Sequence, residues 1–165
     1  MAYATGIRES FERSFGLYRD LVESLREADL DAKLLGMRSN TLGQQLWCVV
    51  GARESYSRAI RAGAWAGFSC SLDYDRTADK EAVRKALRRS EEAVAEALAG
   101  FDGEDDARVR LILDLLEHEA QHHGQLIRYL YGLNLEIPES WKVRYALEDG
   151  APVPGTRALC DCRGQ

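Results

Sequence analysis

Residues 111–130, LILDLLEHEAQHHGQLIRYL, determine the fold class that this 165-residue chain predicts. Apolar residues recur there at intervals of three and four, which is the period of an amphipathic α-helix. The segment also holds all three histidines of the chain, at positions 118, 122 and 123. Because His118 and His122 are four residues apart, their imidazoles project from one face of that helix. The segment therefore predicts a long helix carrying two side chains suited to one metal ion.

Helical patterns continue outward from this segment, and no proline occurs before Pro138. We predict four long helices, over approximately residues 7–28, 41–64, 80–100 and 104–132. Four helices of this length with modest connections are typical of an all-α protein, an antiparallel four-helix bundle. The side chains predicted to face its core include Phe11, Phe15, Leu17, Tyr18, Leu21, Val22 and Leu25 from the first helix and Val83, Leu87, Val94 and Leu98 from the third.

Local signals mark the ends of these helices and the segments outside them. Thr41 is a suitable N-cap for the second helix, and Gln44 can complete a capping box with it. A long loop covers residues 67–76, between the second and third helices. We assign residues 1–147 to one bundle domain and residues 148–165 to a C-terminal tail, with a short helix ending near Leu147 as the last element of the domain.

The composition is that of an ordinary globular chain, with 45% hydrophobic and 30% charged residues. The net charge of -5 argues against binding to nucleic acid, and no apolar run is long enough to span a membrane. The first ten residues do not resemble a signal peptide, so we expect a cytoplasmic protein. Its cysteines are then expected to be free thiols or metal ligands. Cys70, Cys160 and Cys162 are predicted to be ordinary thiols, although a C-x-C pair can also bind metal or cycle as a dithiol.

On the wheel of the fourth helix, His118, His122 and Glu119 interrupt the apolar arc, and His123 lies at its edge. Burying polar groups costs about 1–3 kcal/mol each unless they are satisfied, and a metal ion satisfies neutral imidazoles. Two inward histidines at this spacing therefore favour a metal site over ordinary buried histidines. His123 is a weaker candidate for a ligand than His122.

His118-Glu119-Ala120-Gln121-His122 also reads as H-E-x-x-H, the motif of a class of zinc proteases. In the extended form of that motif a glycine and a third histidine follow at set positions, but Gly124 comes one residue early and Arg128 cannot bind zinc. No strands are predicted that would hold a peptide substrate. A zinc protease is therefore the least favoured of the functional alternatives.

The motif and its surroundings resemble the DinB-like family of damage-inducible bacterial proteins, which are related to thiol-dependent S-transferases. The family motif H-x-x-x-H-x-G-Q is matched by residues 118–125, HEAQHHGQ, and residues 126–133, 137–141 and 41–48 also resemble family members. The resemblance extends over most of residues 7–147. It implies a four-helix bundle with a divalent metal bound by three histidines near one end.

By this resemblance, two of the three ligands correspond to His118 and His122, while the third position is occupied by Cys48. A thiolate is a good zinc ligand, so the substitution favours zinc over harder ions, with nickel or another transition metal as alternatives. Cys48 lies on the uncharged side of its helix, whose solvated side we assign to Arg53, Glu54, Arg58 and Arg61. The other interpretation is that Cys48 is a small buried hydrophobic residue.

Three protein ligands leave an open position on the metal, where water or a small thiol can bind. The resemblance then implies a metal-dependent thiol S-transferase acting on a small electrophile. Glu119 and Gln125 are near enough to the histidines to serve as hydrogen-bond partners around the site. Alternatively, Glu119 pairs with an arginine and Gln125 packs against a neighbouring helix. The main functional alternative is a non-catalytic metal-binding or stress-response module with a modified site. We expect a homodimer in either case.

Overall fold

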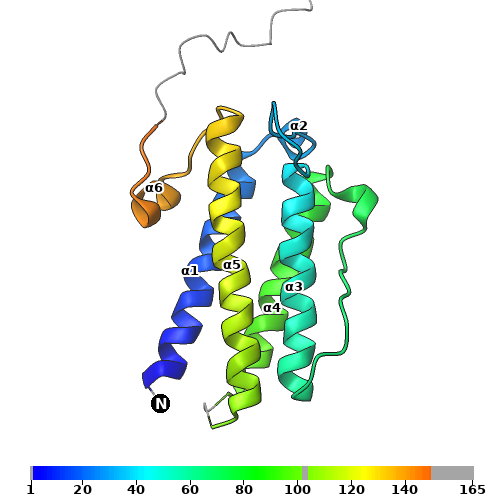
Figure 1. The fold of residues 1–165 in the computed structure, drawn as a ribbon, viewed down its shortest axis with the longest axis vertical. Helices are drawn as coiled ribbons and strands as arrows, with labels where there is room; N and C mark the ends of the chain where they lie inside the picture. The colour runs from blue at the N-terminus through cyan, green and yellow to red at the C-terminus, as the bar shows by residue number, and fades with distance from the viewer. Residues whose placement is uncertain (1, 102–103, 150–165) are drawn as a thin grey trace, which may run out of the picture.

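A computed structural model describes residues 2–101 and 104–149 (Figure 1). Within these residues the regular structure is helical, as the sequence predicts. The elements are α1 Ala2–Ser24, α2 Glu27–Leu30, α3 Leu42–Ala62, the 3-10 turn η1 Tyr74–Arg76, α4 Lys80–Ala99, α5 Asp106–Gly132 and α6 Glu139–Tyr145. The long helices α1, α3, α4 and α5 form a bundle. The first helix ends earlier than predicted, and the separate turn α2 follows it.

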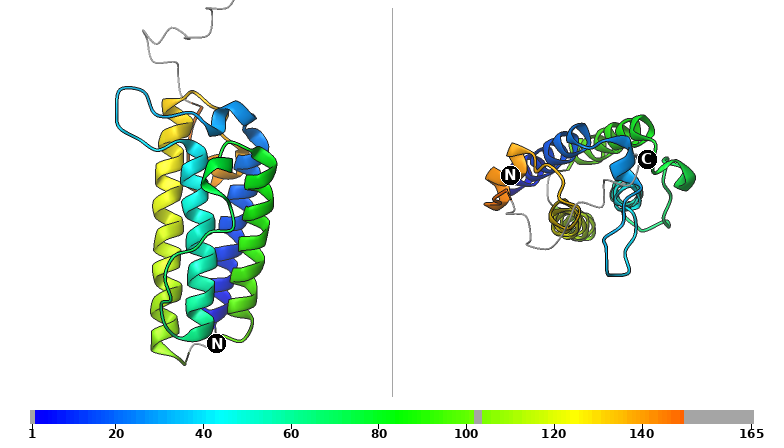
Figure 2. Two further views of the ribbon diagram at one scale, coloured as in Figure 1. Left: turned by 90° about the vertical axis from the view of Figure 1, so that its right-hand side faces the viewer. Right: turned by 90° about the horizontal axis from the view of Figure 1, so that it is seen from above.

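The helices of the bundle do not reverse direction at every connection (Figures 1 and 2). Lys80, at the start of α4, donates hydrogen bonds to backbone carbonyls at the end of α1, so these two helices are antiparallel. Arg61, near the end of α3, reaches the Ala93 carbonyl in α4, and α3 and α4 run in the same direction. The connection between α3 and α4 is therefore long, and not modest as we predicted. Residues 63–79 return along the whole bundle, which a segment extending about 3.3 Å per residue easily spans.

The start of α3 is fixed by the capping box that the sequence predicts. The Thr41 hydroxyl accepts a hydrogen bond from the Gln44 backbone N–H at 3.1 Å, and the Gln44 side chain accepts one from the Thr41 N–H at 2.9 Å. At the other end, Gly63 takes the left-handed conformation that closes many helices. These two ends set the axial position of the residues that α3 contributes to the site.

The core consists of two apolar clusters separated by a layer of buried polar side chains. All the apolar side chains that we predicted to face inward from the first and third helices are buried. One cluster includes Leu21, Leu46 and Leu126, and the other includes Phe11 and Ile112. Between them along the helices lie Ser14 from α1, Arg53 from α3, Glu91 from α4 and Glu119 from α5. Each long helix thus contributes a polar residue to one level of the bundle.

Helix α6 is the short helix predicted after the bundle, and it packs against α1. Trp141 is fully buried, and its indole N–H donates a 2.7 Å hydrogen bond to the Leu17 carbonyl. Among the described residues, no helix has the length and apolar character needed to cross a membrane. The Cys160 and Cys162 pair lies outside the described residues.

Two glycines of α3 provide a test of how closely the elements pack. A Cβ at Gly43 would overlap the backbone carbonyl of Thr77, which cannot move easily, whereas a Cβ at Gly51 would meet only the half-exposed ring of Phe68. Alanine otherwise stabilises a helix interior by about 1 kcal/mol relative to glycine. We expect Gly43→Ala to lower the free energy of unfolding by about 1–3 kcal/mol and Gly51→Ala to leave it equal or higher, as measured by urea denaturation. Equal destabilisation by both would contradict the close approach at Gly43.

Candidate metal centre

The polar residues of the histidine motif divide between two faces of α5. His118, His122, Gln125 and Tyr129 follow one another at helical spacing, and their side chains share one side of the helix. Glu119 and His123 are four residues apart on the adjacent side, where both contact Ser14 of α1. The first face forms the candidate metal centre and the second forms part of the core.

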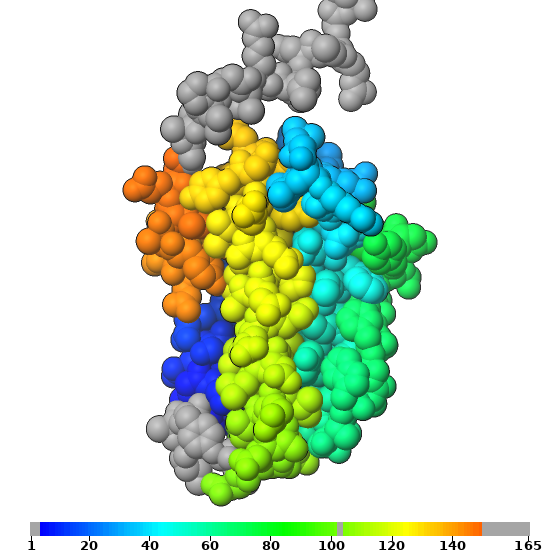
Figure 3. Space-filling model, in the orientation of Figure 1, coloured from blue at the N-terminus to red at the C-terminus, as the bar shows by residue number. Residues whose placement is uncertain are grey.

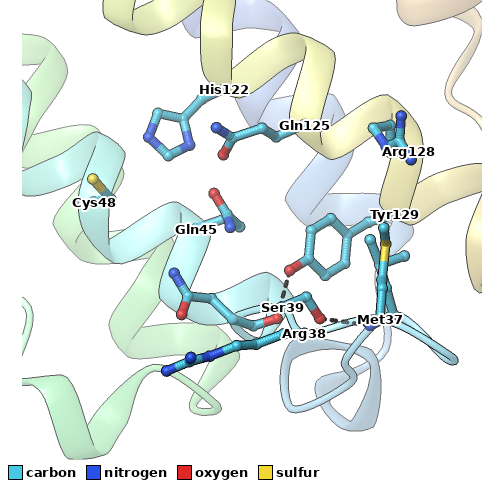
Figure 4. A pocket seen from close by; sticks show the side chains of 11 residues that line it. Met37, Arg38, Ser39, Gln45, Cys48, His122, Gln125, Arg128 and Tyr129 are labelled. Carbon is cyan, nitrogen blue, oxygen red and sulfur yellow. Dashed lines mark hydrogen bonds between the residues drawn. The ribbon is translucent and has the colours of Figure 1, made fainter.

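The structure brings Cys48 of α3 together with His118 and His122 of α5. The ligand atoms of these three side chains lie within 4.8 Å of one another. The Cys48 sulfur is 3.6 Å from His118 Nε2, and the two imidazole rings are 4.5 Å apart between centroids. In Figure 4, Cys48 and His122 lie on opposite helices at the same end of a pocket. The geometry therefore supports Cys48 as a residue that faces the two histidines, as a ligand would.

Burial keeps these three groups uncharged in the absence of a metal. It lowers the pKa of His118, and together with the neighbouring His118 it lowers the pKa of His122 to about 4. It also raises the pKa of the Cys48 thiol. At neutral pH the cluster therefore contains two neutral imidazoles and a thiol, so only the thiol has to lose a proton to bind a metal.

Unsatisfied nitrogen atoms in the cluster also favour a bound ion. Nδ1 of His118 and Nδ1 of His122 are buried, and neither has a hydrogen-bond partner within the described part of the chain. An unpaired buried polar atom costs about 1–3 kcal/mol. A metal ion bound at Nδ1 of either ring would remove this cost for that ring. The cluster could therefore hold a metal ion, with ligand types suited to a divalent transition metal.

Glu119 belongs to a buried ion pair rather than to the metal cluster. Its carboxylate accepts hydrogen bonds from Arg53 at 2.7 and 2.8 Å and another from the Ser14 hydroxyl. This is the pairing with an arginine that we considered as the alternative role of Glu119. Burial alone would raise its pKa, but Arg53 and Ser14 outweigh burial and hold the pKa below its usual value. A carboxylate held in this way is a poor general base, which argues against the zinc-protease mechanism.

The assignment of Arg53 and Glu54 to the solvated side of α3 was wrong. The Arg53 side chain is 0% exposed, and its guanidinium lies 4.7 Å from the ring centroids of both Phe15 and Tyr18. Glu54 is also buried, where it accepts a hydrogen bond from the backbone of Ser71 in the long returning loop. Arginine is normally solvated, and a buried partner so distant in sequence leaves no periodic signal. The residue type alone therefore led us to place Arg53 on the wrong side of α3.

His123 is a core histidine, as its position at the edge of the apolar arc suggested. Nδ1 is 2.6 Å from the Tyr145 hydroxyl, and Nε2 is 3.0 Å from the Ser14 hydroxyl. Because Ser14 donates its proton to Glu119, its oxygen is free to accept the Nε2 proton of a neutral imidazole. Burial lowers the pKa of His123 to about 4, which fits this neutral form. With both nitrogens occupied, His123 is not placed to bind the metal.

A pocket of about 530 Å³ opens beside the cluster, and Cys48 and His122 form part of its wall (Figure 4). Gln125 lines this pocket, and so does Gln45, which the sequence reasoning missed. Cys70 is outside the cluster: its thiol donates to the Trp47 carbonyl at 3.5 Å, and burial raises its pKa to about 11. The other two cysteines are beyond the described residues.

Comparison with known proteins adds no further constraint. No protein-family model matches the chain, and no curated protein matches its sequence. The functional proposal therefore rests on the residues and distances above and on the resemblance of the sequence motifs.

The buried ion pair gives a prediction about stability. Glu119→Gln would leave the guanidinium of Arg53 without its carboxylate, with Glu91 only 3.9 Å away as a remaining partner. Breaking a buried pair typically costs about 3–5 kcal/mol, whereas an exposed pair contributes about 0–1 kcal/mol. We expect Glu119→Gln to lower the free energy of unfolding by about 3–5 kcal/mol. Glu23→Gln, which breaks the more exposed pair with Arg84, is the control. Similar urea midpoints for the two variants would refute this account of Arg53.

Proposed function

We propose that this protein is a metal-dependent enzyme of the thiol S-transferase type, belonging to the DinB-like family. Its metal is zinc, bound by Cys48, His118 and His122. The observation that carries the proposal is the convergence of these three ligand atoms within 4.8 Å, at the wall of a pocket large enough for a small substrate. Thiolate and imidazole ligands together favour zinc among the common divalent ions.

The family assignment is supported by the helical bundle and by the position of Cys48. The resemblance assigns the third ligand to this position of α3, and the residue there does lie against His118. Asn40, just before α3, contacts Tyr129, and Arg53 of α3 contacts Glu119, so α3 and α5 are antiparallel, which supports the bundle that the family implies.

A zinc ion with three protein ligands supplies an open coordination position that lowers the pKa of a bound thiol. The chain's own residues then hold the reactants. Cys48 and His122 would hold the ion at the wall of the pocket, and Gln125, which also lines the pocket, can donate a hydrogen bond to a substrate there. In the reaction the thiol loses its proton to solvent, and its sulfur forms a bond to an electrophilic carbon. The bond to the leaving group breaks, and that group departs with the electron pair.

One observation favours a second candidate, a non-catalytic metal-binding module. No carboxylate of the described residues lines the pocket, and Glu119 is held in its ion pair with Arg53. A reaction that needed a general acid at the substrate would find none there. Thiol transfer to a carbon bearing a good leaving group has no such requirement, which is why it is the first proposal.

Metal content tests the site directly. We expect about one zinc ion per chain by elemental analysis, and a loss of at least about tenfold in zinc affinity for Cys48→Ala and His118→Ala, because each removes one of three ligands. Cys70→Ser is the matched control, since Cys70 is a half-buried thiol outside the cluster, and it should bind zinc normally. Unchanged metal content in His118→Ala would refute the site.

Turnover separates the two candidate functions. Zinc-loaded protein should accelerate the reaction of a small thiol with an alkyl halide, and a chelator or Cys48→Ala should abolish the acceleration. Zinc binding that depends on Cys48, without acceleration for any thiol and electrophile pair, would establish the non-catalytic module instead.

A further inference from the structure

The loop between α2 and α3 forms one wall of the pocket, and it is held in place at several points. Lys33 and Thr41 form an antiparallel bridge across its base, and the Leu34 backbone N–H donates to the Ser39 hydroxyl at 2.9 Å. From α5, the Tyr129 hydroxyl donates to the Asn40 carbonyl. Figure 3 shows this loop against the end of α5 on one face of the molecule. Arg38 is therefore carried on an anchored loop beside the pocket.

The pocket is positively charged, although the whole chain carries a net charge of -5. Arg38 lines it from the loop and Arg128 lines it from α5, and no aspartate or glutamate of the described residues lines it. Neither arginine has an ion pair or a hydrogen bond with another described residue, whereas Arg19, Arg53 and Arg84 all pair with carboxylates. Two unpaired guanidinium groups on the walls of one pocket favour an anion over a cation there.

Two amide side chains lie on the path from the arginines to the metal cluster. Gln45 is 9% exposed, and Gln125 follows His122 by one turn of α5 (Figure 4). Both line the pocket, where an amide can donate a hydrogen bond to a ligand oxygen. Along α5, Arg128 lies six residues beyond His122, or about 9 Å of helix rise.

We propose that this pocket binds a small organic carboxylate whose charged end pairs with Arg38 or Arg128, which line the pocket from different sides (Figure 4). The other end of the ligand reaches the cluster of Cys48, His118 and His122, and this part of the proposal rests on the proposed function. The carboxylate can belong to the thiol or to the electrophile. In both cases the arginines act on substrate affinity, and the amides of Gln45 and Gln125 bind the middle of the molecule.

Three thiols of equal length test the charge preference: 3-mercaptopropionate, 3-mercaptopropan-1-ol and 3-mercaptopropylamine. Binding to cobalt-loaded protein is followed by the absorbance of the sulfur-to-cobalt charge transfer. We expect the acid to bind at least about tenfold more tightly than the alcohol, and the amine to bind most weakly, because a charged hydrogen bond to a guanidinium group favours the acid alone.

The double variant Arg38→Gln/Arg128→Gln should remove this preference while leaving cobalt content unchanged. The matched control is Arg89→Gln/Arg110→Gln, which makes the same change in net charge at exposed residues outside the pocket. If the control removes the preference equally, long-range attraction rather than the pocket is responsible, and the proposal is overturned.

Chloroacetate and chloroacetamide determine whether the electrophile carries the charge. If it does, the double variant raises KM for chloroacetate alone, and the thiols show no preference. If both the thiols and the electrophiles lack an arginine-dependent preference, the carboxylate pocket is refuted, while cobalt binding still supports the metal centre.

Absence of cobalt binding would refute the proposed function, and the anion site can then be tested on its own. Titration of metal-free protein with 3-mercaptopropionate should shift the side-chain NMR signals of Arg38 and Arg128 and leave those of Arg89 and Arg110 in place. No selective shift would overturn the anion site as well.

Discussion

The buried pair between Arg53 and Glu119 is the constraint on which the bundle and its site depend. A charge in the middle of a core is tolerated only with a closely placed counter-charge and satisfied hydrogen bonds. Arg53 obtains these from one carboxylate on α5 and from the ring faces of Phe15 and Tyr18 on α1. Sliding α3 against α5 by one turn would separate the pair. The pair therefore fixes the axial register that places Cys48 opposite His118, the residue next to Glu119.

The six residues from His118 to His123 serve two different purposes because a helix separates adjacent residues by about 100°. His118 and His122 face Cys48 of α3, with His122 lining the pocket, while Glu119 and His123 both contact Ser14 of α1. The second pair is linked through Ser14 and extended to Tyr145 of α6, so it holds the helix that carries the first pair. One segment thus supplies both the candidate ligands and the hydrogen bonds that orient them.

The sequence predicted well what local chemistry controls, namely the long helices, the Thr41 capping box and the apolar stripes. Spacing and the family resemblance together also identified Cys48, His118 and His122, which the fold brings together. The sequence did not predict the burial of Arg53, whose partner is 66 residues away. Nor did it predict that residues 63–79 return along the bundle or that the loop before α3 carries Arg38 to the pocket. These features depend on which helices become neighbours, and no local pattern encodes that choice.

The choice of cysteine at position 48 has an electrostatic consequence for the whole pocket. Two histidines leave both charges of a divalent ion unbalanced, whereas a thiolate cancels one of them and weakens the attraction of the metal for an anionic substrate. Arg38 and Arg128 restore positive charge at the other end of the same pocket. If a divalent ion binds at the cluster, attraction for a substrate anion would be divided between these two guanidinium groups and the metal. The arginines would hold the charged end of the substrate, which leaves the open metal position to its reactive end.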